Sequence, residues 1–376
     1  MISKLIVIVG FSALALLPLI QRVTNFLPDA PLSENRAQVA VPQWEKVMLK
    51  DYLMGWQSWF NDRYAGRNFL IRLKTQIDYS VFSYSDKVHI GTDGWLFYRS
   101  VIDVEEPALE RMTDVHHDQI IRNLSDLNAR LARKGIRLII VDCELKDTFY
   151  PEKLPASLPV RPTSPRYQKL RARLAHETGA EYVDASAILR TLKNQRPVFH
   201  KTDFHWNDPA AFAVAEEVVN RVARLAGPAY PGWRWPLEIT SAPLSGGEAS
   251  FMPLLKPVTE TALFVKKTWP DLPRNYREPD GPFEFSIVHK VSDPSLLPGI
   301  VVFGDSFFDG MMRSGFIEHF CSVHRTRIFH ATLDQVLVAL PDDTRFFLVQ
   351  FIMTAAPLFS IPVAQPTPSN PASPKS

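Results

Sequence analysis

The architecture of this chain follows from the segment Val301-Val302-Phe303-Gly304-Asp305-Ser306-Phe307-Phe308. The apolar run at 300–303 is typical of a buried strand, and residues 307–320 have the apolar spacing of a helix. A serine at such a strand-to-helix turn presents its hydroxyl outward, and the N–H groups at the helix start point toward an oxyanion formed beside it. We therefore interpret Ser306 as a candidate nucleophile and not only as a capping serine.

Candidates for a base and an orienting carboxylate lie upstream, in Lys201-Thr202-Asp203-Phe204-His205-Trp206. A serine is a weak nucleophile unless a base, itself held by a third group, takes its proton. The segment is predicted to be extended and to precede a helix at 208–225. In extended chain, side chains two residues apart leave on the same side. Asp203 is thus expected to fix the tautomer of His205, which would deprotonate Ser306.

Other interpretations of these residues remain open. His205 would serve equally as a core histidine, and Asp203 as a turn or capping carboxylate. His200, Asp203 and His205 together suggest a metal site, but no further ligand motif accompanies them and no Cys/His spacing resembles a zinc site. Cys143 and Cys321 are too few for a disulfide framework, and the sequence leaves open whether they pair. We predict no metal and no cofactor.

The alternation of strand and helix patterns predicts an α/β fold. Expected strands lie at 136–141, 181–184, 301–303, 327–331 and 346–352, and expected helices at 114–134, 165–178, 185–193 and 208–225. Apolar runs such as 136–141 are the type that is buried on both faces of a parallel sheet. We predict a doubly wound, flavodoxin-like parallel sheet flanked by helices, with a hairpin at 91–98 that has no part in the chemistry.

The composition is that of a globular protein. Of the 376 residues, 46% are hydrophobic and 22% are charged. The net charge of +2 and the pI of about 8.4 are too mild to indicate a nucleic-acid partner, and we predict none.

The N-terminus has the pattern of a signal sequence. Lys4 precedes an apolar run at 5–20, and Arg22 follows it. The run is slightly short for a membrane-spanning helix of about 20 residues, and no small-x-small cleavage site follows closely. We predict an uncleaved signal anchor over 1–27 that leaves the rest of the chain on the far side of the membrane. A cleaved signal peptide and a buried N-terminal helix are the alternatives.

The rest of the chain is expected to be one domain with a linker and a tail. We expect the linker at 28–43 and the domain at 44–355. Within the domain, residues 229–298 are rich in proline and are expected to form a loop-rich insertion over the site. The Pro, Ser, Ala and Thr composition that follows predicts a disordered tail at 356–376.

Four short motifs occur in order along the chain. They are Gly91-x-Asp93-Gly94-Trp95-Leu96-Phe97, Lys146-x-x-x-Tyr150-Pro151, Asp203-x-His205-Trp206 and Gly304-Asp305-Ser306-Phe307. Over roughly residues 40 to 355, this order resembles the alginate O-acetyltransferases of the AlgJ/AlgX type, which carry an SGNH hydrolase-like domain. In ordinary GDSL-type esterases the serine comes first, so the position of the Asp-x-His motif separates the two families.

The resemblance implies an SGNH hydrolase-like fold and a Ser306, His205, Asp203 triad that takes an acetyl group as a serine ester. The acceptor would be a hydroxyl of an exported polysaccharide, alginate or a similar exopolysaccharide, at the periplasmic side of the inner membrane. A membrane-bound O-acyltransferase partner would supply acetyl groups, because acetyl-CoA is not available outside the cytoplasm. We also name Lys146, Tyr150, Arg313 and Gly246 as candidate substrate-binding residues, and a structural role is the alternative for Lys146 and Tyr150.

Two segments depart from the family pattern. Residues 245–249 stand where relatives have a Gly-Asp-Leu-like segment, which leaves the second oxyanion donor open. Val349-Gln350-Phe351 lacks an acidic residue where one is expected. Two alternative functions also remain open: a polysaccharide acetylesterase with the same triad, and a non-catalytic component that binds polymer or scaffolds a secretion complex.

Overall fold

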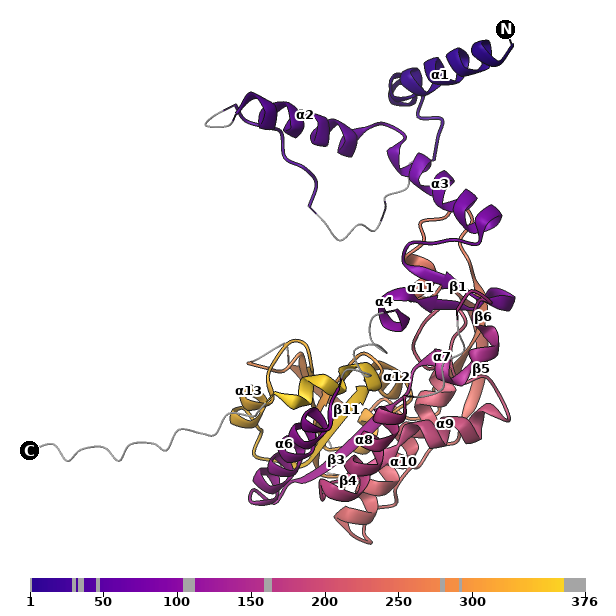
Figure 1. Ribbon diagram of the computed structural model, residues 1–376. Helices are drawn as coiled ribbons and strands as arrows, with labels where there is room; N and C mark the ends of the chain where they lie inside the picture. The colour runs from indigo at the N-terminus through magenta and orange to yellow at the C-terminus, as the bar shows by residue number, and fades with distance from the viewer. Residues whose placement is uncertain are drawn as a thin grey trace, which may run out of the picture. The chain divides into compact units, whose positions relative to one another are not determined.

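A computed structural model of the chain describes residues 2–28, 32, 37–44, 48–103, 112–158, 164–277, 281–290 and 293–361 (Figure 1). The chain divides into two compact units. The smaller unit comprises Met1–Val88 and Ala249–Val258, and the larger unit comprises His89–Glu248 and Thr259–Ser376. The predicted domain at 44–355 is therefore divided between the two units.

The smaller unit contains the helices α1 (Ile2–Thr24), α2 (Leu49–Arg63) and α3 (Arg67–Phe82). Gly66 separates α2 from α3 with a φ of +89°, a left-handed conformation that glycine adopts without strain. Helix α1 covers the apolar run that the sequence analysis assigned to a signal anchor. Within the described part of the chain, however, no helix combines the length and apolarity needed to span a membrane. The predicted anchor is therefore not confirmed.

The described residues of the larger unit contain a seven-stranded sheet. In spatial order its strands are β4 (Glu181–Asp184), β3 (Arg137–Cys143), β11 (Thr344–Ile352), β9 (Gly299–Gly304), β10 (Ser322–Arg327), β8 (Phe285–His289) and β7 (Arg274–Arg277). The first five are parallel, whereas β8 pairs antiparallel with both β10 and β7. The sheet is thus mixed and not purely parallel as predicted, because the hairpin β7–β8, from the predicted insertion, extends one edge.

Helices cover both faces of this sheet (Figure 1). Ile139 and Val141 of β3 enter one apolar cluster, whereas Leu138 and Ile140 enter the other, as the two-residue period of a strand requires. The first cluster takes buried residues of α9 (Ala185–Lys193), α10 (Asp208–Ala226) and α12 (Phe308–Arg313), and the second takes those of α6 (Asp114–Ala132), α8 (Pro165–Glu177) and α13 (Leu333–Val338). Burial on both faces confirms the predicted α/β arrangement of a sheet flanked by helices.

Two small hairpins and several short helices complete the described structure. Strand β1 (Val88–Ile90) pairs with β2 (Leu96–Tyr98), and β5 (Glu238–Leu244) pairs with β6 (Glu260–Lys266). The short helices are α4 (Arg99–Ile102), α7 (Lys146–Phe149), α11 (Gly247–Ser250), η1 (Thr92–Gly94), η2 (Pro151–Lys153), η3 (Ile317–His319) and η4 (Met353–Ser360). The β1–β2 hairpin lies where the sequence predicts one.

Two predicted elements near the serine have different bounds in the structure. The helix predicted at 307–320 ends at Arg313, because Gly315 takes a φ of +92° that turns the chain away from the helix axis. The strand predicted at 327–331 lies earlier, as β10.

The first residues of the predicted tail at 356–376 form part of a helix. Helix η4 runs to Ser360, and Phe359 is buried against the second apolar cluster. Residues 362–376 of the predicted disordered tail lie outside the described residues. Cys143 and Cys321, whose pairing the sequence left open, are both free thiols.

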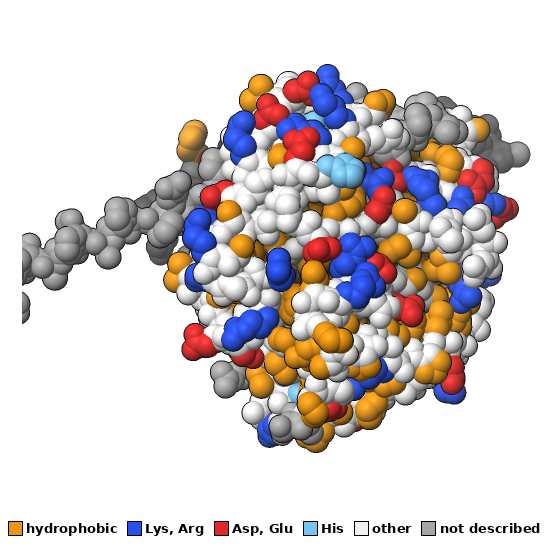
Figure 2. Space-filling model, turned by 90° about the horizontal axis from the view of Figure 1, so that it is seen from below, with side chains coloured by type: hydrophobic (Ala, Val, Ile, Leu, Met, Phe, Trp, Pro, Cys, Tyr) orange, Lys and Arg blue, Asp and Glu red, His pale blue; other side chains and the backbone are white. Residues whose placement is uncertain are grey.

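Charged side chains of both signs lie intermixed on the face shown in Figure 2. Opposite charges also alternate between α6 and α8, where Lys169 Nζ lies 2.8 Å from Asp114 Oδ1 and Arg173 Nη1 lies 2.8 Å from Asp118 Oδ1. This mixture agrees with the small net charge of the chain.

Candidate active site

The turn after β9 is fixed by the buried side chain of Asp305. Its Oδ1 accepts hydrogen bonds from the Phe307 amide and from Nε2 of Gln350, both at 2.9 Å, and its Oδ2 accepts one from the Ile352 amide at 2.7 Å. Burial raises the pKa of Asp305, and these hydrogen bonds only partly offset that effect. Gln350, in the segment where an acidic residue was expected, thus ties the serine turn to β11.

The loop before α10 is held by local capping and by one long-range contact. Asn207 is the N-cap of α10, since its side chain accepts a hydrogen bond from the Ala210 amide. Phe199 and Trp206 form an antiparallel bridge that closes the loop. The Trp206 indole donates to the Phe307 carbonyl at 2.9 Å, so the loop is fastened to the residue that follows the serine.

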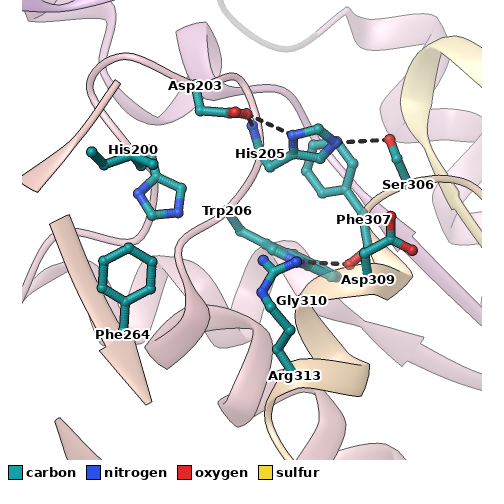
Figure 3. Close-up of a pocket in the computed structure, with 11 residues that line it drawn as sticks. His200, Asp203, His205, Trp206, Phe264, Ser306, Phe307, Asp309, Gly310 and Arg313 are labelled. Carbon is teal, nitrogen blue, oxygen red and sulfur yellow. Dashed lines mark hydrogen bonds and ion pairs between the residues drawn. The ribbon is translucent and has the colours of Figure 1, made fainter. Parts of the chain in front are cut away.

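Asp203, His205 and Ser306 form a continuous chain of hydrogen bonds (Figure 3). The distance from Asp203 Oδ1 to His205 Nδ1 is 2.6 Å, and that from His205 Nε2 to Ser306 Oγ is 2.7 Å. Because a carboxylate only accepts, Nδ1 carries the proton in the neutral ring and Nε2 accepts from the serine hydroxyl. The three residues therefore have the geometry of a nucleophile, a base and an orienting carboxylate.

The Asp203 carboxylate is held by more than the histidine ring. The loop bends and is not extended as predicted, so Oδ1 also accepts from the His205 amide at 3.0 Å, while Oδ2 accepts from the Gly247 amide at 2.7 Å. Burial by itself raises the pKa of Asp203, but the hydrogen bonds from His205 and Gly247 outweigh burial and hold the pKa well below the usual range. The carboxylate is therefore ionised at neutral pH.

A cavity of about 320 Å³ lies beside Ser306. It is lined by His200, Asp203, His205, Trp206, Leu244, Phe264, Ser306, Phe307, Asp309, Gly310 and Arg313 (Figure 3). Leu244 and Phe264 come from the β5–β6 hairpin, within the predicted insertion, and so bring this segment to the cavity. The sequence analysis did not single out these two residues, because a strand pattern does not show what a strand faces.

His200 also lines this cavity and is 95% buried, since its relative exposure is 5%. Its Nδ1 has no hydrogen-bond partner among the described residues, and burial lowers its pKa. In the described part of the chain, no group of three or more His, Cys, Asp or Glu side chains is arranged to hold a metal ion.

Only one of the four predicted substrate-binding residues lines the cavity. Arg313 is half exposed there, and its guanidinium pairs with Asp208 at 2.8 Å. Lys146 and Tyr150 are instead buried, with exposures of 3% and 6%. The Tyr150 hydroxyl accepts from the Val198 amide at 2.9 Å, so it belongs to the core. The burial of Lys146 and Tyr150 agrees with the structural role that the sequence left open as the alternative.

Gly246 does not line the cavity beside Ser306 and contacts the loop that carries Asp203. Its amide donates to Thr202 Oγ1 at 3.0 Å, and the next amide, that of Gly247, donates to Asp203. The amides of Gly246 and Gly247 are thus engaged with the loop that carries the acid, and neither is free to bind an oxyanion.

Replacing Gly246 with alanine is expected to displace Asp203. An added Cβ would lie 2.5 Å from the Thr202 carbonyl oxygen and 2.6 Å from Asp203 Cβ, so the backbone must move. We expect a loss of about 1–3 kcal/mol in the free energy of unfolding, measured by denaturant titration. Gly10→Ala is the control, because a Cβ at Gly10 meets no atom within 4 Å. Equal stability of the two variants would contradict this account of Gly246.

Comparison with known proteins agrees with this fold. Residues 88–236 match the family model described as the SGNH hydrolase-like domain of the acetyltransferase AlgX. Among solved structures, PatB1 of Bacillus cereus superposes with a TM-score of 0.51 at 14% identity, covering 65% of this chain and 92% of that chain. At this identity the superposition shows the fold alone. The larger unit therefore has an SGNH hydrolase-like α/β fold.

Curated relatives point to one family. The chain is 29% identical over 143 residues to the probable alginate O-acetylase AlgJ of Pseudomonas aeruginosa, which covers 38% of this chain and 35% of the relative. It is 25% identical over 206 residues to the probable alginate O-acetylase AlgJ of Pseudomonas syringae pv. tomato, which covers 52% of this chain and 49% of the relative. The matches thus span half the length of these relatives or less. They confirm the resemblance to the AlgJ/AlgX type.

Proposed function

We propose that this protein is an O-acetyltransferase that moves an acetyl group, through an ester of Ser306, onto a hydroxyl of an exported polysaccharide. Alginate or a similar exopolysaccharide is the proposed acceptor, because the relatives are named alginate O-acetylases. The hydrogen-bond chain from Asp203 through His205 to Ser306 is the observation that carries the proposal.

The proposed reaction has two halves that use the same groups. First, His205 Nε2 takes the proton of Ser306 Oγ as the oxygen attacks the acetyl carbonyl, and the imidazolium then returns this proton to the leaving group of the donor. Next, Nε2 takes a proton from the sugar hydroxyl, which attacks the acetyl ester. The proton finally passes to Ser306 Oγ as that ester bond breaks.

Asp203 and a backbone amide support these steps. The ionised Asp203 carboxylate holds the Nδ1–H tautomer and stabilises the positive ring that forms twice in each cycle. We propose the Ser306 amide as one donor to the oxyanion, where loss of a single donor typically costs about 10²–10³ in rate.

We also propose a location and a donor. The acetyl donor is a membrane-bound O-acyltransferase, and the protein works at the periplasmic side of the inner membrane, attached through its N-terminal helix. The apolar run at 5–20 behind Lys4 supports this placement. Fractionation tests it on cells that express either the full chain or a chain in which a cleavable signal peptide replaces residues 1–27. The full chain is expected in membranes and the chain released from the signal peptide in the periplasmic fraction.

The activity is tested by supplying the full chain with an activated acetyl ester and with oligosaccharides of alginate and of other exopolysaccharides. Mass spectrometry then follows acetyl groups on the protein and on the sugars, with Ser306→Ala in parallel. Acetyl on a sugar with the wild type alone would establish the transferase. Release of free acetate alone, again dependent on Ser306, would favour an acetylesterase. Indifference to the substitution would favour a non-catalytic polymer-binding or scaffold component.

A further inference from the structure

The ammonium group of Lys146 is fully engaged with backbone carbonyls at the edge of the active site. Its Nζ donates to Leu96 O at 2.6 Å and to Lys201 O and Asp203 O at 3.0 Å each. A lysine ammonium has three donors and no acceptor, so these three carbonyls and the Glu248 carboxylate, whose Oε2 accepts from Nζ at 3.3 Å, share its whole capacity. Lys146 thus joins the β1–β2 hairpin to the loop that carries Asp203.

The Lys146 charge is buried beside the carboxylate of Glu248, and Asp203 and Glu260 also lie near enough to act on it. Glu248 Oε2 lies 3.3 Å from Nζ, and the exposures of the two side chains are 3% and 0%. The rings of Trp95 and Phe97 lie 5.5 Å and 5.3 Å from Nζ, within the range of cation–π attraction. Burial lowers the pKa of Lys146 and raises that of Glu248 to about 8, and the opposite charges partly offset both effects.

A buried ion pair such as Lys146–Glu248 adds little to the free energy of unfolding by itself. Replacing a buried ion pair with apolar side chains of similar volume is often neutral or stabilising. Here, however, the lysine also satisfies three carbonyls, two of which belong to the loop at 201–203. This arrangement points to a role in the geometry of that loop.

The amide side of the same loop is held by a different carboxylate. Glu260 of β6 accepts from the Lys201 amide at 2.9 Å and from the Thr202 amide and hydroxyl at 2.7 Å each. The loop is therefore held through its carbonyls by a cation and through its amides by an anion. The Asp203 carboxylate, which must meet His205 at 2.6 Å, is anchored one residue beyond the amides that Glu260 holds.

We propose that Lys146 is a positioning residue that holds the Asp203–His205 pair in register with Ser306, acting through the Asp203 and Lys201 carbonyls. The hairpin at 91–98 then has a part in the chemistry after all, because Leu96 O, Trp95 and Phe97 hold the ammonium in place. This inference rests on the proposed roles of Ser306, His205 and Asp203.

The kinetic test compares Lys146→Met with Glu248→Gln, using release of acetate from an activated aryl acetate. Lys146→Met is expected to lower kcat about 10–100-fold with little change in KM, since a displacement of about 1 Å can cost 10²-fold. Glu248→Gln leaves the three carbonyl bonds in place and is expected to keep a kcat close to that of the wild type. Lys193→Met is the matched control, because Lys193 Nζ also donates to a backbone carbonyl, that of Phe149.

A spectroscopic readout separates this inference from the proposed function. The short bond between His205 Nδ1–H and Asp203 should give a downfield proton resonance in the wild type and in Glu248→Gln. Folded Lys146→Met should lose it. If the wild type shows the resonance but no Ser306-dependent acetate release, the proposed function fails while the positioning role stands or falls on the resonance.

The positioning role can still be tested if Lys146→Met does not fold. If Lys146→Met does not fold, the double variant Lys146→Met/Glu248→Leu removes both buried charges and is expected to fold. A folded variant of either kind with wild-type kcat and an intact resonance would overturn the positioning role. If neither variant folds, Glu248→Gln decides. This variant keeps the three hydrogen bonds from Lys146 to backbone carbonyls, so loss of the downfield resonance in it would also overturn the positioning role.

Discussion

Replacing Ser306 with alanine is expected to abolish acetyl transfer, with a fall in kcat of at least about 10³-fold. The substitution removes the hydroxyl oxygen that lies 2.7 Å from His205 Nε2 and that would attack the acetyl carbonyl carbon. Without this hydroxyl no acetyl ester can form at position 306. Any residual release of acetate then comes from substrate binding and from the oxyanion donors alone. Acetate release and the mass of the intact protein, with and without an activated ester, measure both consequences.

The fold of this variant should be unchanged, because the Ser306 hydroxyl bonds only a partly exposed ring and the turn is held by Asp305. Ser125→Ala is a suitable control, since that hydroxyl donates to the Glu177 carbonyl far along the chain from the site residues. Acetylated protein in the Ser306→Ala sample would show that another residue accepts the acetyl group. Unchanged sugar acetylation would remove Ser306 from the mechanism altogether.

Those parts of the site that are carried by neighbouring residues could be predicted from the sequence. Asp203 and His205 lie two positions apart, and Ser306 follows an apolar run typical of a buried strand, so the local pattern was enough to propose all three as site residues. The two-sided burial of β3 was predictable for the same reason, since Ile139 and Leu138 are both apolar. These features depend on chain geometry over a few residues.

The rest depends on contacts between distant segments, for which one sequence has no local signal. Lys146 and Leu96 are 50 positions apart, and Gly247 and Asp203 are 44 positions apart, yet each pair is joined by a hydrogen bond. The sequence does not show whether a lysine is buried or faces a substrate. It therefore could not show that the Lys146 ammonium contacts three backbone carbonyls. The early end of α12 had a visible signal in Gly315, but its left-handed φ is set by the tertiary structure.

Asp203→Asn is expected to lower kcat by roughly 10³–10⁴-fold while leaving Ser306 in place. An asparagine that turns its NH₂ group toward Nδ1 donates a hydrogen bond to that nitrogen. The ring must then carry its proton on Nε2, which can no longer accept the proton of the serine hydroxyl. The same substitution should alter the dependence of stability on pH. The pKa of Asp203 is lowered in the folded protein, so its contribution to stability is present above the ordinary Asp pKa of about 3.9 and is lost as pH falls through the folded-state value.

The wild type should therefore be more stable than Asp203→Asn at neutral pH, and the difference in Tm should shrink as the pH is lowered below the ordinary range of an aspartate. Asp93→Asn is the matched control: this exposed carboxylate pairs with Lys153 at 2.6 Å, and asparagine tolerates its φ of 55°. It should leave kcat unchanged. A fall in kcat of less than about tenfold for Asp203→Asn would mean that Asp203 does not set the tautomer of His205, because the loss of a correctly placed proton acceptor cannot be that mild.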